Sequence, residues 1–203
     1  QNIASLIFDT MGIYWTMKYQ NDKDKELLRE WDLKPKNLQV KVLVPFGHFD
    51  KFQERGIPID DKFALDVSEL NAEDWIITFG LELIHPVSVL IERTLSKIRK
   101  RDEKFTLKEI IQEIEKDTKS ERETINAASG LFEAANTWGI FATHEQEPTQ
   151  VSDLITRATT TVLDLSVYNS IGAFNVRALV VSLLSRKIFN QRMLARKLEE
   201  IES

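Results

Sequence analysis

The chain of 203 residues contains no cysteine, which excludes disulfide bonds, thiolate metal sites, iron–sulfur clusters and cysteine nucleophiles. Its longest apolar runs, such as residues 178–184, are far too short to cross a bilayer, and no basic and apolar leader opens it. We therefore expect a cytoplasmic protein without a membrane partner. The formal net charge of −5 restricts any nucleic-acid contact to a local basic patch.

The short motifs of self-contained enzymes are also missing. No Gly-x-x-x-x-Gly-Lys-Ser/Thr phosphate loop occurs, and no two glycines lie close enough for a dinucleotide-binding turn. The three histidines, His48, His85 and His144, are scattered without metal-ligand spacing, and no serine lies in a nucleophile elbow. The sequence therefore predicts neither a zinc site nor a complete catalytic apparatus.

Hydrophobic residues make up 42% of the chain and charged residues 29%, which is typical of a globular protein with a sizeable core. Short apolar or alternating runs predict buried strands at residues 3–8, 38–44 and 159–165. Short helices are predicted at residues 23–31 and 50–55. Residues 63–70 are expected to be extended, with Ser68 capping a short helix.

From Pro86 onward the apolar period changes to about 3.6, which predicts a block of helices. Two helix starts have the form of a capping box, in which a hydroxyl and a carboxylate three residues later cap each other: Thr106 with Glu109, and Ser120 with Glu123. A last apolar stripe predicts one helix over residues 174–201, about 40 Å long.

The order strand, strand, helical block, strand, long helix predicts an α/β protein. We expect residues 1–85 to form the first part of an α/β core, residues 86–138 a helical insertion, and residues 139–203 the second part of the core with the long helix. The chain begins within a strand pattern and ends within a helix pattern that has no stop signal. We therefore expect it to be an internal piece of a longer protein.

Asp9 is the main candidate for a functional residue, because it closes the first predicted strand, at the end where ligands gather in parallel sheets. An acid there can hold a metal-bound water or arrange the surroundings of a nucleotide phosphate. Thr10 follows it, so no catalytic glutamate stands beside the aspartate. The structural alternative is that Asp9 caps the following turn, with Gly12 supplying backbone freedom. The third predicted strand also ends near an acid.

Two other features leave nucleic-acid binding open. The densest basic cluster holds Lys97, Arg99, Lys100 and Arg101, but residues 92–123 mix basic and acidic side chains, as in a solvated helical face. Helices at residues 106–117 and 120–136, with a wing at residues 139–141, would make a winged helix. The second of these helices is acidic, however, which disfavours it as a reading helix.

Three segments resemble the HerA-like archaeal ATPases. Leu6-Ile7-Phe8-Asp9-Thr10-Met11-Gly12-Ile13-Tyr14-Trp15 resembles the strand followed by Asp-x-x-Gly-x-Tyr of that family. Residues 42–47, 63–70 and 73–75 resemble the stretch after it. Residues 162–166 and the long helix ending in Arg192-x-x-x-Arg196-x-x-Glu199-Glu200 resemble the segment that leads to the family's Walker B strand.

The resemblance implies a partial RecA-like P-loop NTPase core of the FtsK group. Hexameric rings of this group hydrolyse ATP with Mg²⁺ and translocate double-stranded DNA in DNA processing or repair, often with the NurA nuclease. By position, Asp9 matches the family's acid at the nucleotide pocket, whereas Ile13 stands where a glutamate usually precedes Tyr14.

The family's layout places the phosphate loop before Gln1 and the Walker B acids after Ser203. The resemblance therefore implies the middle of a translocase or helicase, a piece that does not itself hydrolyse ATP. The alternative from another class is a non-catalytic interaction or scaffold module.

Overall fold

The computed structural model describes residues 3–169 and 174–202 of the chain. They form two compact units: the first comprises residues up to 62 together with 152–169, and the second comprises residues 63–151 together with the long last helix. These borders differ from the predicted ones at 85/86 and 138/139. The reason is that a helix at residues 72–78 packs both on the helical block and on the last helix, so all three belong to one unit.

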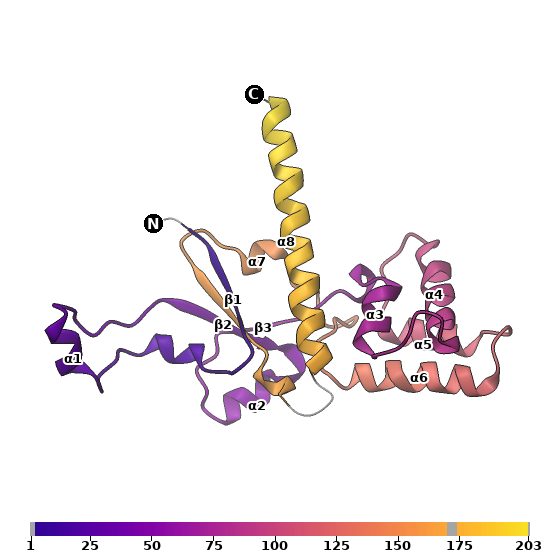
Figure 1. The fold of residues 1–203 in the computed structure, drawn as a ribbon, viewed down its shortest axis with the longest axis horizontal. Helices are drawn as coiled ribbons and strands as arrows, with labels where there is room; N and C mark the ends of the chain where they lie inside the picture. The colour runs from indigo at the N-terminus through magenta and orange to yellow at the C-terminus, as the bar shows by residue number, and fades with distance from the viewer. Residues whose placement is uncertain (1–2, 170–173, 203) are drawn as a thin grey trace. The chain divides into compact units, whose positions relative to one another are not determined.

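The first unit contains a four-stranded sheet with the strand order β1-β4-β2-β3 (Figure 1). The strands are β1 (Ser5–Asp9), β2 (Val40–Pro45), β3 (Asp61–Phe63) and β4 (Thr160–Asp164). β4 runs parallel to both of its neighbours, so that Ile7 and Val42 both lie opposite Val162. The three strands predicted from the apolar runs are confirmed, and the fold is a mixed α/β fold, as predicted.

The position of β4 between two strands explains its composition. Four of its five residues are buried, and Val162 packs with Val40 and Val42 in an apolar core that Ile7 and Trp15 extend. β1 lies at the edge of the sheet, and Asp9 is its one buried residue. The β-branched residues Thr160, Thr161 and Val162 suit the central strand β4, because β-branched side chains pack well on a pleated surface.

Short helices connect the strands of the first unit. They are the 3-10 helix η1 (Tyr14–Lys18), α1 (Lys25–Glu30), η2 (Phe46–His48), α2 (Phe49–Glu54), α7 (Val151–Leu154) and η4 (Ser166–Tyr168). The helices predicted at residues 23–31 and 50–55 are thereby confirmed as α1 and α2. η1 packs Trp15 and Met17, both partly buried, on the apolar core of the sheet, whereas α1 buries no residue.

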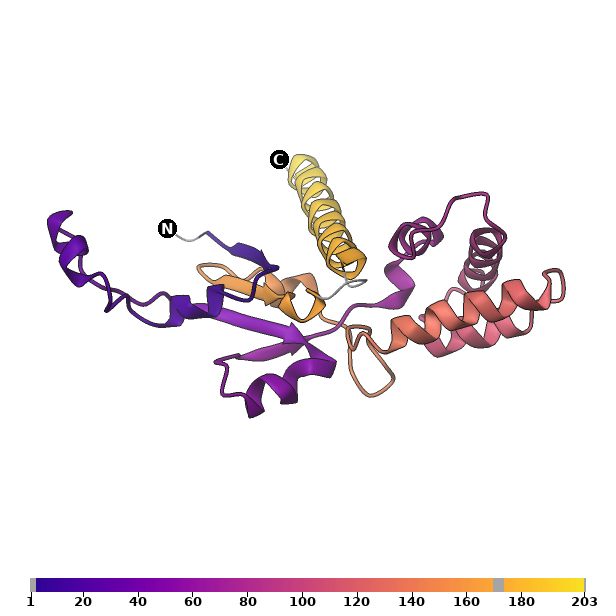
Figure 2. The same cartoon turned by 60° about the horizontal axis from the view of Figure 1, so that its bottom comes forward.

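The second unit is helical. It contains η3 (Val67–Glu69), α3 (Ala72–Thr78), α4 (Pro86–Arg99), α5 (Leu107–Glu115), α6 (Arg122–Asn136) and α8 (Phe174–Glu202). Helices α4, α5 and α6 pack on one another, and Figure 2 shows α5 and α6 side by side. The predicted helical block and the predicted long last helix are confirmed.

Aromatic rings join α3, α6 and the segment after α6. Trp75 of α3 is fully buried, with its ring centroid 4.9 Å from that of Phe132 and 5.3 Å from that of Phe141. Phe79 contacts both Trp75 and Phe132. Aromatic side chains bury large apolar areas, so this cluster is a major part of the core of the second unit.

Two of the three predicted caps are wrong. The box of Thr106 and Glu109 is present at the start of α5. Ser120 does not cap α6, which begins after Glu121, because its hydroxyl instead accepts a hydrogen bond from Arg93 at 2.8 Å. Ser68 lies inside η3, whose cap is Asp66.

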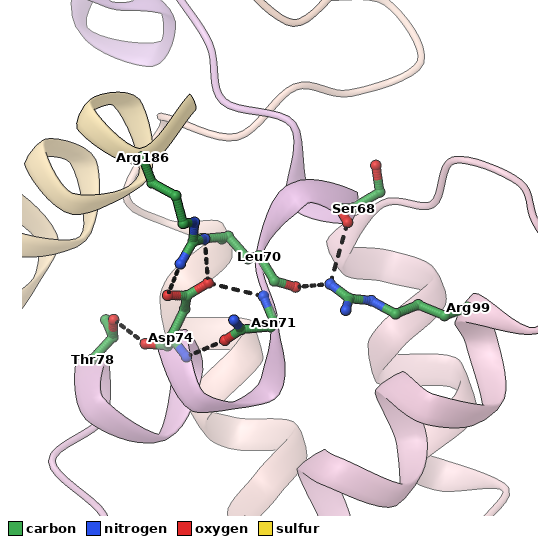
Figure 3. A network of polar contacts seen from close by, with 7 residues as sticks. All are labelled: Ser68, Leu70, Asn71, Asp74, Thr78, Arg99 and Arg186. Carbon is green, nitrogen blue, oxygen red and sulfur yellow. Dashed lines mark hydrogen bonds and ion pairs between the residues drawn. The ribbon is translucent and has the colours of Figure 1, made fainter. Parts of the chain in front are cut away.

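Helix α3 begins with a capping box of Asn71 and Asp74, which share two hydrogen bonds of 2.8 and 2.9 Å (Figure 3). The same Asp74 carboxylate accepts hydrogen bonds from both terminal nitrogens of Arg186 in α8, at 2.9 and 2.7 Å. This hydrogen-bonded ion pair raises the pKa of Arg186 above its ordinary value. Five residues before Asp74, Glu69 of η3 forms an ion pair with Lys187 of α8 at 2.7 Å. Asp74 thus both caps α3 and fastens α8 to it.

We expect Asp74→Ala to lower the free energy of unfolding of the second unit by about 2 kcal/mol, about half from the lost cap and half from the lost ion pair. Asp74→Asn retains an oxygen that accepts the backbone N–H of Asn71, so it loses only the ion pair. Losing the ion pair costs little, because Arg186 is partly exposed and water screens its charge. It should therefore cost about half as much as Asp74→Ala. Urea denaturation followed by helical circular dichroism measures both, and equal losses for the two variants would contradict the dual role.

Candidate functional site

Asp9 lies at the carboxyl end of β1, as predicted, and is almost completely buried at 1% exposure. The parallel register places it directly opposite Asp164, the last residue of β4. Asp164 is also buried, at 2% exposure. Two carboxylates therefore lie side by side at the edge of the sheet where ligands of open parallel sheets bind.

The carboxylate of Asp9 accepts four backbone N–H groups of the loop that follows it. One oxygen accepts from Met11 at 3.1 Å and from Gly12 at 2.8 Å. The other accepts from Ile13 and Tyr14, each at 2.8 Å. A carboxylate has about four lone-pair positions, and all four are used here. Asp9 thus fixes the conformation of residues 10–14, and its predicted turn-capping role is confirmed.

Gly12 brings this loop against the turn that follows β4. Its φ of +70° is rare for a residue with a side chain. A Cβ at this position would lie 2.5 Å from the hydroxyl of Ser166 and 3.5 Å from a carboxylate oxygen of Asp164. Trp15 also holds this loop, because its indole N–H donates to the carbonyl oxygen of Gly12 at 3.0 Å. The predicted need for a glycine is confirmed, and the contact with Ser166 is its physical reason.

Asp164 has fewer donors than its neighbour. The backbone N–H of Ser166 donates to it at 2.9 Å. Burial raises the pKa of Asp164 above its ordinary value, the hydrogen bonds from Ser166 oppose that rise, and the negative charge of Asp9 adds to it. The two carboxylates thus differ in their surroundings, since Asp9 accepts hydrogen bonds from four backbone N–H groups.

This difference predicts a pH dependence of stability. Because the folded chain keeps the Asp164 proton to a higher pH than the unfolded chain does, the stability from this residue falls as the pH rises above 3.8, the ordinary value. Asp164→Asn removes the titration. We therefore expect the stability of the parent minus that of Asp164→Asn to be largest in acid and to decrease towards neutral pH. Urea denaturation over a pH series measures it, and a difference that rises with pH would contradict the prediction.

The chain's residues do not fit a Mg²⁺ site at this edge. Both oxygens of Asp9 are already occupied by N–H groups, so none of its lone pairs is left to ligate a cation. Over residues 3–169 and 174–202, no cluster of three or more histidine, aspartate or glutamate side chains is arranged to hold a metal ion. The assignment of Asp9 as a catalytic residue stays a prediction, and the geometry supports a positioning role.

The basic cluster at the end of α4 is largely paired within the second unit. Lys97 and Arg101 both bind the buried carboxylate of Glu113 in α5, the second at 2.6 Å. Lys97, then Arg101, lower the pKa of Glu113 against the opposing effect of burial. Arg99 donates to the carbonyl oxygen of Leu70 at 2.6 Å. These cations hold α4 to its neighbours, which favours the structural interpretation of the cluster.

The predicted wing at residues 139–141 is wrong. Phe141 instead forms a parallel bridge with Leu65, and the Leu65 N–H donates to the carbonyl of Ile140 at 2.8 Å. This segment returns to the strand-like residues before η3, so it cannot form the hairpin of a winged helix.

No protein-family model and no curated protein matches this chain. Within residues 3–169 and 174–202, no helix combines the length and the hydropathy that crossing a bilayer requires. The functional argument therefore depends on the residues themselves. The sequence indicated Asp9 as a site residue and showed an acid near the end of the third predicted strand, but it did not place that strand, 155 positions away in the chain, beside the first.

Proposed function

We propose that this chain is the middle portion of an ATP-driven double-stranded DNA translocase of the HerA type, with a RecA-like core, that acts in DNA processing or repair. The observation that carries the proposal is the pair of buried aspartates at the carboxyl ends of adjacent parallel strands. The order of the three segments that resemble the HerA-like ATPases supports it. The proposal includes a cytoplasmic hexameric ring and a NurA-type nuclease as partner.

Within this proposal, Asp9 acts on the nucleotide pocket through the loop that it holds. Its four hydrogen bonds give residues 10–14 one conformation without any contribution from a ligand. A preorganised loop costs little to order when a substrate binds beside it. ATP and Mg²⁺ themselves require a phosphate loop and a second acid, which the family's layout places outside these 203 residues.

Sequencing the reading frame on both sides of these codons tests the proposal most directly. We expect a Gly-x-x-x-x-Gly-Lys-Ser/Thr motif ahead of Gln1 and an apolar strand ending in Asp-Glu after Ser203. A start codon and a stop codon at these borders would contradict a motor ATPase and would favour the interaction module.

We further expect the purified 203-residue chain to release no phosphate from ATP above the rate of buffer alone. Phosphoryl transfer in this class of enzyme requires a lysine that binds the phosphates and an acid that orients water. The phosphate-loop motif that carries this lysine does not occur in this sequence. A phosphate-release assay with and without double-stranded DNA measures it. Turnover that rises in proportion to the concentration of the chain and elutes with it in size-exclusion chromatography would contradict the proposal.

A non-catalytic interaction module is the second candidate function. The observation in its favour is the number of large apolar side chains that the second unit exposes, both between α3 and α4 and along the last half of α8. Exposed apolar patches of this kind mark protein–protein contacts.

A further inference from the structure

A cavity between α4 and the turn that joins α5 to α6 is lined by charged and hydroxyl side chains, and its volume is about 260 Å³. Four of the lining residues are cations, two from α4 and two from the turn: Arg93, Lys97, Lys116 and Lys119. The acids of the lining are Glu113 and Asp117. This site is here called the cationic cavity.

Both acids of the cationic cavity already have partners. Asp117 accepts hydrogen bonds from Nε of Arg93 at 3.1 Å and from Nη2 at 2.7 Å, so these two charges cancel. Glu113 is buried and forms ion pairs with two cations, Lys97 and Arg101. One carboxylate shared by two cations leaves one positive charge without an anion.

Two lysines of the turn add to this excess of positive charge. Lys116 and Lys119 are exposed, and within the described residues neither side chain forms a hydrogen bond or an ion pair. The nearby acids Glu115 and Glu121 do not line the cavity. Four cations thus face two carboxylates across the lining, an excess of two positive charges before Arg101 is counted.

The fold holds these cations in place without a ligand. Arg93 also donates from Nη2 to the hydroxyl of Ser120 at 2.8 Å, which leaves its Nη1 without an acceptor in the part of the chain that the structure describes. Asp117 in turn accepts the backbone N–H groups of Lys119 at 3.1 Å and Ser120 at 2.8 Å. The turn that carries the two free lysines is therefore fixed to α4, and charges held in this way lose little entropy when an anion binds.

We propose that the cationic cavity binds a phosphate group, as the free ion or on a small phosphorylated molecule. A phosphate monoester carries close to two negative charges at pH 7, which matches the excess in the lining, whereas each phosphate of a nucleic-acid backbone carries one. Phosphate oxygens accept strong hydrogen bonds from guanidinium and ammonium groups. The volume lies below the range of about 300–1,000 Å³ of most ligand pockets, which favours a small ligand. The inference does not depend on ATP or DNA binding.

The test is a titration of the ¹⁵N-labelled full chain with inorganic phosphate, at pH 7.5 and with chloride keeping the ionic strength constant. We expect the amide shifts of residues 116–120 to saturate. Lys119→Ala should weaken binding about fivefold or more, and Lys116→Ala combined with Lys119→Ala should abolish saturation. Lys108→Ala is the matched control, because Lys108 is an exposed lysine of α5 outside the lining, and it should leave binding unchanged.

Two further measurements exclude general effects of the anion. Phosphate should raise the urea midpoint more for the parent chain than for the double lysine variant, which corrects for the stabilisation that phosphate gives to any protein. Glycerol phosphate serves as the second probe. Tighter binding of this ester than of inorganic phosphate would identify a small phosphorylated molecule as the occupant, and equal or weaker binding would identify the free ion.

Two outcomes would overturn the proposal. The first is a set of shifts that grow with phosphate without saturating, or that are the same in the double lysine variant. The second is binding of a double-stranded DNA fragment that depends on Lys116 and Lys119 while phosphate does not bind, which would assign the cavity to a nucleic-acid backbone. Circular dichroism checks that each variant is folded, as expected for substitutions at exposed lysines.

Discussion

Replacing Asp9 by alanine should lower the free energy of unfolding of the first unit by about 3–5 kcal/mol, because four backbone N–H groups lose one shared acceptor. Each bond to a charged acceptor contributes about 1.5–3 kcal/mol, but the four are not additive, since water reaches the loop once it opens. Hydrogen exchange gives the specific measurement. The amides of Met11 and Gly12 should exchange much faster in the variant.

Asp9→Asn is the informative partner of that variant because it keeps the volume of the side chain. One oxygen becomes an amide nitrogen, so two of the four N–H groups then face a donor instead of an acceptor. We therefore expect Asn to destabilise nearly as much as Ala. A loss below about 1 kcal/mol for both would show that the loop does not depend on the carboxylate.

Gly12→Ala should cost about 3 kcal/mol. Part of the cost, about 1–2 kcal/mol, arises from a left-handed backbone with φ of +70°. The rest arises from the new Cβ, which would lie 2.5 Å from the Ser166 hydroxyl and 2.7 Å from the Ser166 Cβ. The turn after β4 must shift to admit it, so the neighbouring Asp164 is disturbed as well.

Gly56→Ala is the matched control for Gly12→Ala. Gly56 has a similar φ of +67°, but its Cβ would meet no atom within 4 Å. It should therefore show only the backbone cost, about 1–2 kcal/mol. Combining Gly12→Ala with Ser166→Gly removes the clashing atoms and should recover most of the additional loss. Equal losses for Gly12→Ala and Gly56→Ala in thermal denaturation would refute the close contact.

Features set by neighbouring residues were predictable from the sequence. The strand at 160–164 follows from its β-branched run, and the capping box of Thr106 and Glu109 follows from their spacing. Ser120 shows where such reasoning fails. Its local pattern matches a cap, but Asp117 accepts its backbone N–H at 2.8 Å and Arg93, 27 residues earlier, donates to its hydroxyl. Contacts between distant segments outweighed the local pattern, as tertiary structure often does.

The candidate site shows the same division. Asp9 was identifiable because an acid after an apolar run is a local signal, and the glycine three residues later marked a turn. The pairing with Asp164 was not identifiable, because it depends on which strands become neighbours in the sheet. The same holds for Arg186 and Asp74, 112 residues apart, where nothing in either local sequence distinguishes the pair from other exposed charges.

The central place of β4 has a consequence for biosynthesis. β1 and β2 pair with β4 and are not neighbours of each other, so a nascent chain that has left the ribosome up to residue 150 holds two strands without the one that joins them. Residues 63–151, by contrast, form contacts within a continuous stretch. The helices of residues 63–151 should therefore fold first, while the edges of β1 and β2 that pair with β4 stay unpaired until residues 160–164 have been synthesised. Exposed edges of this kind recruit chaperones or other nascent chains, so slow translation between residues 45 and 160 should favour aggregation.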